Sequence, residues 1–299
     1  MTIKRGLAID WLGGVPLLFV FLWSTGFVGA KLGLPYAEPM TFLLLRFALV
    51  VALMLPLALL FKAPWPDTWR QAGHIAVAGV LLHGAYLGGC FAAIHAGMSA
   101  GTTALVCGLQ PILTAFAAAP ILGERVSRRQ WAGLVLGLAG VALVLERRIS
   151  LSGLSGYSIA MVILALASIT LGTVYQKRFA GHFDLRSGSV IQFIAAAAAV
   201  LPFALAFESM QVEWTGEFVF ALGWLVLVLS IGAISLLTLI IRRRAATNAA
   251  SLFYLVPPTT ALQAYWLFGE TITGVALAGM VLVVAGVALV LVRKAEVAA

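Results

Sequence analysis

Several side chains that could contact a small molecule lie inside long apolar stretches of this sequence. His83 and Tyr86 share a face of one stretch at helical spacing, and Gln110 belongs to a polar stripe on another. With Trp23 and Tyr254 they could line an apolar substrate cavity that has few charges. Alternatively, these polar and aromatic groups could serve only to hold neighbouring helices together. His83 could bind a substrate, carry a proton or hydrogen-bond a neighbouring helix.

Prolines interrupt two of these stretches at matching places. Pro111 lies about 15 Å into its stretch, and Pro257 and Pro258 interrupt another. A proline cannot donate to the carbonyl oxygen four residues earlier. Paired interruptions of this kind point to a transport site near the membrane midplane, whereas the alternative is a bend needed only for packing.

Arg46 is a cation within an apolar stretch. It could bind a substrate carboxylate. We favour a structural role, in which the side chain snorkels to the membrane surface or pairs with Glu38 or Glu270.

Neither a metal site nor a cofactor is predicted. All eleven acidic residues lie near the ends of apolar stretches or between them. Glu124 and Glu270 follow glycines and precede Ser127 and Thr273, so we read them as turn-and-cap residues for the next helix. "GMSAG" at 97–101 matches the G-x-S-x-G pattern of hydrolases. Its context is a short loop between helices, so catalysis by Ser99 is a minor alternative.

The composition indicates a membrane protein. Of the 299 residues, 62% are hydrophobic and only 10% are charged, whereas soluble domains are about a quarter charged. The net charge of +8 could suggest nucleic acid, but the cations are separated by apolar runs and form no patch. Cys90 and Cys107 fall inside apolar runs and are read as packing residues.

Long apolar runs predict an all-α polytopic protein with ten spans. They lie near 11–33, 38–61, 72–95, 99–121, 127–146, 156–178, 186–207, 218–241, 246–268 and 273–292. If the N-terminus is cytoplasmic, 15 Lys and Arg residues fall on the inner side and 3 on the outer side. We therefore expect both termini to be cytoplasmic.

An internal repeat with an offset of 146 residues covers the chain. "PILTAFAAAPILGERVS" at 111–127 corresponds to "PPTTALQAYWLFGETIT" at 257–273, and "AGVALVL" occurs at 139–145 and 285–291. Two units follow, at 1–149 and 150–299. Each holds five predicted spans, so the second would be inverted in the membrane. Inverted repeats around a central cavity are typical of transporters that work by alternating access.

The chain resembles the drug/metabolite transporter superfamily, specifically its EamA-type ten-span members. The residues that carry this are "WSTGFVGAKLG" at 23–33, "LRF" at 45–47, and the stretch at 109–145 with its copy at 253–291. The resemblance implies a ten-helix basket with a central cavity and secondary transport of metabolites. Within the family, the chain looks most like bacterial exporters of aromatic and other amino acids.

These observations predict an exporter or facilitator of amino acids in the bacterial inner membrane. The small multidrug exporters of the same superfamily use a glutamate in their first span, where this chain has Trp23, Ser24 and Thr25. Proton-coupled multidrug or metabolite efflux is therefore the alternative. We expect a small-molecule substrate, contact with lipid, no nucleic acid, and a monomer or homodimer.

Overall fold

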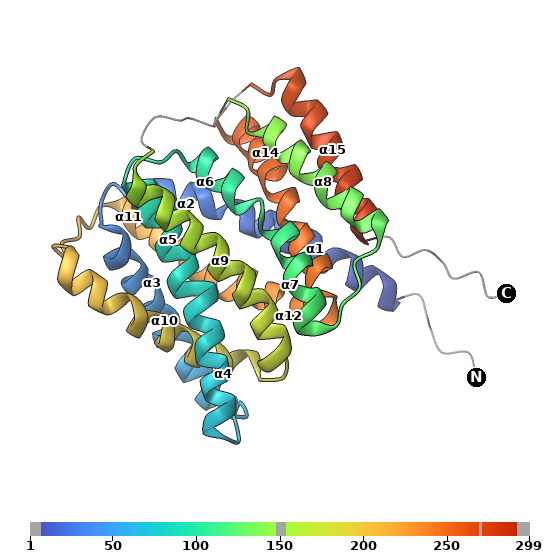
Figure 1. The fold of residues 1–299 in the computed structure, drawn as a ribbon. Coiled ribbons are helices and arrows are strands. Elements are labelled where there is room, and N and C mark those ends of the chain that lie inside the picture. The colour runs from blue at the N-terminus through green and yellow to red at the C-terminus, as the bar shows by residue number, and fades with distance from the viewer. Residues whose placement is uncertain (1–6, 148–153, 269–270, 292–299) are drawn as a thin grey trace, which may run out of the picture.

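The structure is a computed structural model that describes residues 7–147, 154–268 and 271–291. The first half of the chain contains the helices α1 (Leu7–Ser24), α2 (Gly26–Gly33), α3 (Pro39–Leu60), α4 (Trp69–Gly79), η1 (Val80–Ala85), α5 (Tyr86–His95), α6 (Ala100–Cys107), α7 (Gln110–Leu122) and α8 (Arg128–Val144). The second half contains α9 (Gly156–Phe179), α10 (Leu185–Phe207), α11 (Gly216–Trp224), η2 (Leu225–Ala233), α12 (Ile234–Arg243), α13 (Ala246–Ser251), η3 (Leu252–Leu255), α14 (Val256–Phe268) and α15 (Gly274–Leu291) (Figure 1).

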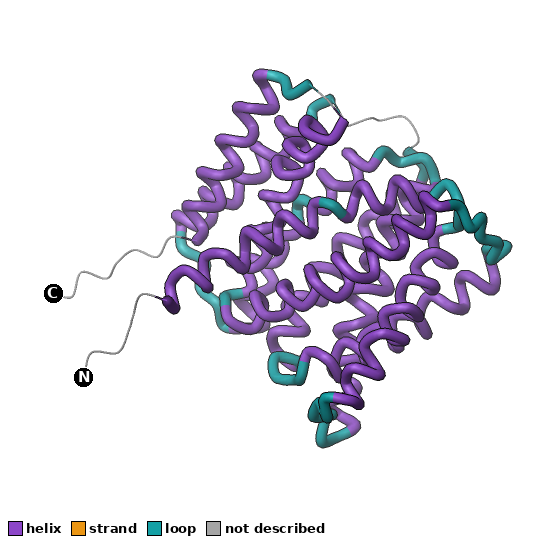
Figure 2. Tube along the Cα trace, turned by 180° about the vertical axis from the view of Figure 1, so that it is seen from behind, coloured by secondary structure: helices purple, strands orange, loops and turns teal. Residues whose placement is uncertain are grey.

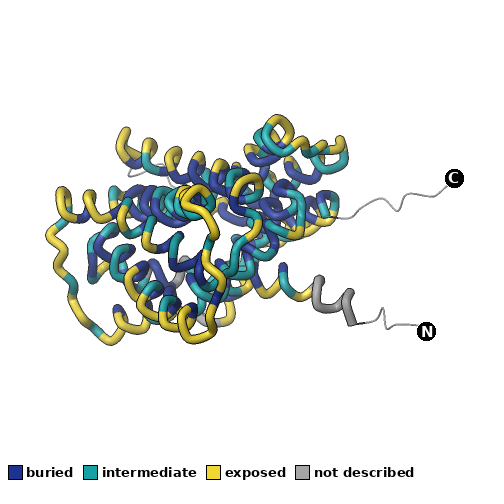
Figure 3. Tube along the Cα trace, turned by 90° about the horizontal axis from the view of Figure 1, so that it is seen from below, coloured by how far each residue is buried: buried dark blue, intermediate teal, exposed yellow. Residues whose placement is uncertain are grey.

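The described residues are helices joined by short loops and contain no strand (Figure 2). Seven helices are long and apolar enough to cross a membrane, and Gly14–Ser24 is a shorter apolar helix. Large apolar side chains remain exposed, among them Leu60, Phe207 and Trp266. Figure 3 shows that exposed positions follow the outside of the helices and buried ones lie between them. A surface of this kind suits lipid rather than water. The count of ten spans stays a prediction, because three of the expected runs are broken or shorter.

Two of the expected runs are interrupted near the prolines. The chain leaves α6 at Cys107, turns through Gly108 and Leu109, and starts α7 at Gln110. The corresponding second-half segment passes from α13 through the 3₁₀ turn η3 into α14. The starts of α6 and α13, and those of α7 and α14, are 146 residues apart, as the repeat requires.

Two π-helical segments also lie at matching places. Val80–Ala85 interrupts the helix formed with α4 and α5, and Leu225–Ala233 interrupts the one formed with α11 and α12. A π turn adds a residue to the helical repeat and rotates the side chains that follow. Such insertions are rare and often mark functional sites, so their recurrence 145 residues apart ties both halves to a common local design.

The helices α8 and α15 lie side by side (Figure 1) and cross through glycines. A Cβ on Gly133 would lie 2.6 Å from the Gly286 carbonyl oxygen, and one on Gly140 would lie 2.7 Å from that of Gly279. Rising numbers on α8 meet falling numbers on α15, so the two helices run antiparallel. The GxxxG pattern at 133–137 thus serves a contact within the chain.

The N-terminal end of α3 and the C-terminal end of α10 are joined by two carboxylates. Glu208 Oε1 accepts from the backbone N–H of Met40 at 2.7 Å, and its Oε2 accepts from Thr41. In return, Glu38 Oε2 accepts from the backbone N–H and hydroxyl of Ser209 at 2.6 Å. The first turn of α3 carries unpaired amides, which is where a carboxylate is favoured.

Glu124 stabilises a different helix from the one we expected. Gly123 ends α7 with a left-handed φ of 68°, and Glu124 Oε1 accepts from the backbone N–H of Ala246 at the start of α13. Ser127 caps the next helix, α8, with Gln130 as its capping-box partner. The prediction that Glu124 serves the following helix is therefore wrong. Gly269 and Glu270 lie outside the described residues.

Candidate substrate cavity

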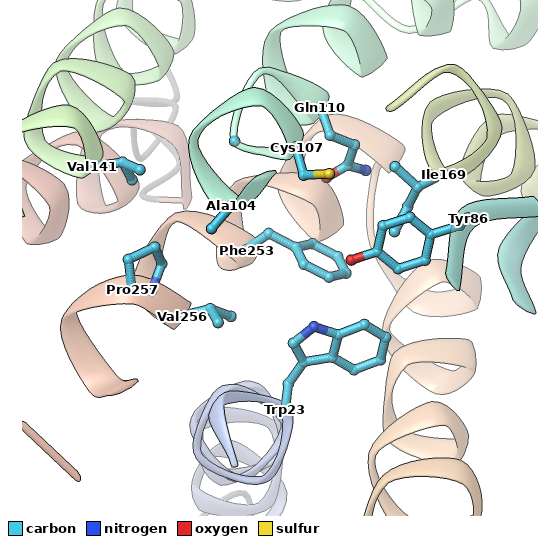
Figure 4. Close-up of a pocket in the computed structure, with 11 residues that line it drawn as sticks. Trp23, Tyr86, Ala104, Cys107, Gln110, Val141, Ile169, Phe253, Val256 and Pro257 are labelled. Atoms are coloured by element: carbon cyan, nitrogen blue, oxygen red, sulfur yellow. The ribbon is translucent and has the colours of Figure 1, made fainter. Parts of the chain in front are cut away.

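A small cavity lies where the two interrupted helices meet. Its volume is about 40 Å³, enough for roughly two to four water molecules. Figure 4 shows the side chains around it, which come from both halves of the chain. The lining residues are Trp23, Tyr86, Ala104, Cys107, Gly108, Gln110, Val141, Ile169, Phe253, Val256 and Pro257.

Much of the lining consists of positions related by the repeat. Trp23 and Ile169, Cys107 and Phe253, and Gln110 and Val256 are each 146 residues apart, and all six side chains line the cavity. A site on a two-fold axis between two repeats would collect matched positions in this way. Sequence analysis missed Ile169, Phe253 and Val256, although adding 146 to the residue numbers would have found them.

Aromatic rings form the apolar walls. The rings of Trp23 and Phe253 meet edge-to-face with centroids 5.3 Å apart, and Phe19 supports both from behind. The Tyr86 hydroxyl points inward toward Phe253 (Figure 4). These rings suit an apolar or aromatic group, and their faces also attract cations.

Gln110 is the most polar side chain of the lining. It is 1% exposed, and its Nε2 donates to Thr114 Oγ1 at 3.3 Å. Its Oε1 is buried and accepts no hydrogen bond in the described part of the chain. A buried unpaired acceptor costs about 1–3 kcal/mol. Gln110 therefore carries an acceptor that a donor entering the cavity could use.

The interruption at Pro111 adds a second acceptor. Ile112 and Leu113 donate their backbone N–H groups to the Leu109 carbonyl, and no described group donates to that of Gly108. Gly108 itself lies in the cavity wall. In the second half Pro257 lines the cavity, whereas Pro111 and Pro258 do not.

The two cysteines meet at the edge of the cavity. Cys90 Sγ on α5 lies 3.7 Å from Cys107 Sγ on α6, and both residues are free thiols. They pack together with Tyr86. This agrees with their reading as packing residues.

His83 lies outside the cavity, contrary to our grouping of it with Tyr86. It is 3% exposed, stacks on Phe193 with centroids 4.6 Å apart, and lies 3.5 Å from Gln192 Oε1. Gln192 in turn donates to Gln176. His83 belongs to the π-helical segment η1. The side chains of His83 and Tyr86 therefore point in more different directions than they would in a regular α-helix.

Arg46 does not snorkel. It is 4% exposed, and its Nε donates to Ser230 Oγ on η2 at 2.8 Å. It does not pair with Glu38, whose carboxylate binds Ser209. The structural role that we favoured therefore takes another form, a hydrogen bond between α3 and η2, because interhelical packing surrounds the guanidinium before it can reach the surface.

Tyr254 also lies outside the cavity. Its ring packs over Gly137, where a Cβ would lie 2.5 Å from Tyr254 Cδ2. Its fully buried hydroxyl has no partner among the described residues. The 3₁₀ turn η3 directs the neighbouring Phe253 into the cavity instead.

Ser99 is a helix cap. Its hydroxyl accepts from the backbone N–H of Thr102 at the start of α6. The loop that holds it joins two helices, not a strand and a helix. This context lacks the elbow that a hydrolase nucleophile requires.

Comparisons with known proteins agree on a transporter. The model of the EamA-like transporter family matches residues 12–146 and again 156–292. A probable amino-acid metabolite efflux pump of Salmonella typhimurium is 27% identical, covering 92% of each chain. A probable terminal-alkyne amino-acid exporter of Streptantibioticus cattleyicolor is 29% identical, covering 64% of each chain.

A solved crystal structure shares the fold. It matches with a TM-score of 0.79 at 19% identity, and the match covers 94% of this chain and 97% of that one. The apolar helices make this chain a multi-pass membrane protein. With the family model matching nearly the whole sequence in two copies, the chain belongs to the EamA-like transporter family.

Proposed function

We propose that this protein exports or facilitates the passage of amino acids, chiefly aromatic and other neutral ones, across the bacterial inner membrane. The observation that carries the proposal is the cavity at the two helix interruptions, lined by three pairs of matched residues. Interrupted helices in two repeats are where transporters bind their substrates. The names of the relatives support the same substrate class.

The walls of the cavity favour an amino acid with an apolar side chain. Trp23, Tyr86 and Phe253 offer ring surface, and the lining contains no Lys, Arg, Asp or Glu among the described residues. At about 40 Å³ the cavity is too small for such a substrate. The protein must open it toward one side of the membrane and then the other, with both termini in the cytoplasm and the unit at 1–149 moving against the unit at 150–299. A monomer or a homodimer suffices for this cycle.

Facilitated passage is the mode we favour. Among the described residues no carboxylate lines the cavity to carry a coupling proton, and His83 lies outside it. Proton-coupled efflux of metabolites or drugs is the alternative. It would require a proton path through His83 and Gln192.

Flux in proteoliposomes tests the proposal. Purified protein should carry labelled phenylalanine into vesicles faster than empty vesicles allow, with or without a pH gradient. Ala104→Trp fills the cavity and should abolish flux, whereas the control Ala119→Trp changes an exposed site on α7. A strict need for the gradient would replace facilitation with coupled efflux. An absence of flux for every amino acid would refute the proposal.

A further inference from the structure

The cavity is richer in unpaired acceptors than its apolar walls suggest. Gln110 Oε1 is buried without a donor, and the Gly108 carbonyl receives none from the described residues. Both lie at the junction of α6 and α7, beside the C-terminal end of α6. The C-terminal end of a helix carries partial negative charge, so this corner of the cavity favours a positively charged donor.

The surrounding rings favour the same kind of group. Trp23, Tyr86 and Phe253 present π-electron density around the cavity, which attracts a cation most strongly where water is excluded. No Lys or Arg in the lining competes for the acceptors. Figure 4 shows the Gln110 amide beside the Cys107 sulfur, next to the Tyr86 and Phe253 rings.

We infer that Gln110 Oε1 and the Gly108 carbonyl form a subsite for the primary ammonium group of the substrate. The inference rests on the proposed function and deepens it, because it assigns one end of the amino acid to one corner of the cavity. Nε2 of Gln110 is held by Thr114, so the amide presents its acceptor. The Trp23 indole N–H and the Tyr86 hydroxyl are donors and can serve the carboxylate of the same zwitterion.

Occupancy of this subsite also couples binding to closure. In this structure Gln110 Oε1 is buried and accepts no hydrogen bond from the described residues. A bound ammonium supplies the missing donors, so the closed state is favoured with substrate and disfavoured without it. A transporter that closes only when loaded gains selectivity for substrates that carry the amine.

Three probes of similar shape distinguish recognition of the substrate's amine from recognition of its carboxylate. Calorimetric titration of the full-length protein in nanodiscs would use phenylalanine, phenethylamine and 3-phenylpropionate. The wild type should bind the two amines roughly tenfold to a hundredfold more tightly than 3-phenylpropionate. Gln110→Leu should remove this preference by weakening both amines, and Gln110→Glu should increase it.

Gln263→Leu is the matched control. Gln263 is a buried glutamine whose Oε1 also lacks a partner, but it lies outside the cavity and its Nε2 donates to the Phe21 carbonyl. It should retain the wild-type preference. If Gln110→Leu does not fold, Gln110→Glu decides the question, since an unchanged preference in that variant overturns the subsite.

Failure of the subsite is distinct from failure of the proposed function. If phenylalanine is carried into vesicles but Gln110→Leu still prefers amines, the subsite is wrong and the exporter stands. The same holds if Gln110→Leu loses affinity for 3-phenylpropionate instead, because the amide would then bind the carboxylate. If wild-type protein neither carries phenylalanine nor binds any probe, both proposals fall.

Discussion

Individual buried polar atoms without partners mean different things in different surroundings. Gln110 Oε1 lies in the cavity wall, where a ligand can reach its side chain once the cavity opens. The Tyr254 hydroxyl is equally unpaired but packs among Leu134, Val141 and Val283. Tyr254 itself does not line the cavity, so we expect its hydroxyl to cost stability without serving the ligand.

Replacing that hydroxyl therefore should stabilise the protein. Tyr254→Phe keeps the ring over Gly137 and removes one unsatisfied buried group, so we expect a gain of about 1 kcal/mol. The midpoint of thermal unfolding in detergent should rise, and phenylalanine flux should be unchanged. A lower midpoint would show that the hydroxyl has a partner.

At the scale of elements, glycines allow α8 and α15 to pack backbone against backbone. The backbones of α8 and α15 touch at two glycine pairs, Gly133 with Gly286 and Gly140 with Gly279. The repeat relates Gly133 to Gly279 and Gly140 to Gly286, so each glycine contacts the repeat equivalent of the other. In a membrane, such close packing replaces the hydrophobic driving force that helices have in water.

A methyl group at this crossing should separate the helices. In Gly140→Ala the new Cβ would meet the backbone of α15 at 2.7 Å, and overpacking of this kind costs about 1–3 kcal/mol. Gly223→Ala is the control, because nothing lies within 4 Å of its Cβ. The midpoint temperature of thermal unfolding should fall for Gly140→Ala and stay unchanged for Gly223→Ala. Equal midpoints would mean that α8 and α15 can move apart to accommodate the methyl group without loss of stability.

The junction of α3 and α10 should weaken in acid. The hydroxyl of Ser209 donates to Glu38 and lowers the pKa of that carboxyl below its ordinary value of 4.5. A carboxyl with a lowered pKa stabilises the folded state above its ordinary pKa, and this contribution disappears as the pH falls through the lowered value.

The midpoint of thermal unfolding should therefore fall as the pH is lowered from 7 to 4 and below. Wild type should lose more stability over the interval than Glu38→Gln, which has no proton to take up. Glu213→Gln is an exposed control whose carboxylate accepts no hydrogen bond among the described residues, and it should behave as wild type. Identical curves for wild type and Glu38→Gln would exclude this contribution.

At the scale of the whole molecule, matched features relate the two halves. Helix starts, π turns and cavity residues recur at or next to the 146-residue offset. Tyr36 accepts from the backbone N–H of Glu213 at one end of the molecule, and Ser187 donates to Pro64 at the other. These contacts assign loops to opposite ends but not to a side of the membrane.

Cysteine labelling in cells would assign the sides. In a background with Cys90→Ser and Cys107→Ser, the charge distribution predicts that Glu213→Cys faces outward and Asp67→Cys faces the cytoplasm. A membrane-impermeant maleimide should label Glu213→Cys in spheroplasts and Asp67→Cys only after permeabilisation. Labelling of Asp67→Cys in intact spheroplasts would reverse the orientation.

Sequence alone determined the properties that depend on composition and spacing. Apolar content specified helices in a lipid environment, and the 146-residue repeat located the interruptions at Pro111 and Pro257. These features are local, since a proline removes its hydrogen bond whatever surrounds it. Trp23, Tyr86 and Gln110, which the polar and aromatic pattern singled out, line the cavity, and their role in binding substrate stays a prediction.

Only the tertiary structure decided which face of each helix meets the cavity. The π turn at His83 and the 3₁₀ turn that contains Tyr254 rotate these side chains away from it, and regular helical spacing cannot anticipate either turn. Arg46 finds Ser230, 184 residues away, and Glu124 finds the start of α13. Such partners depend on how helices pack against one another, because burial brings together groups that the sequence separates.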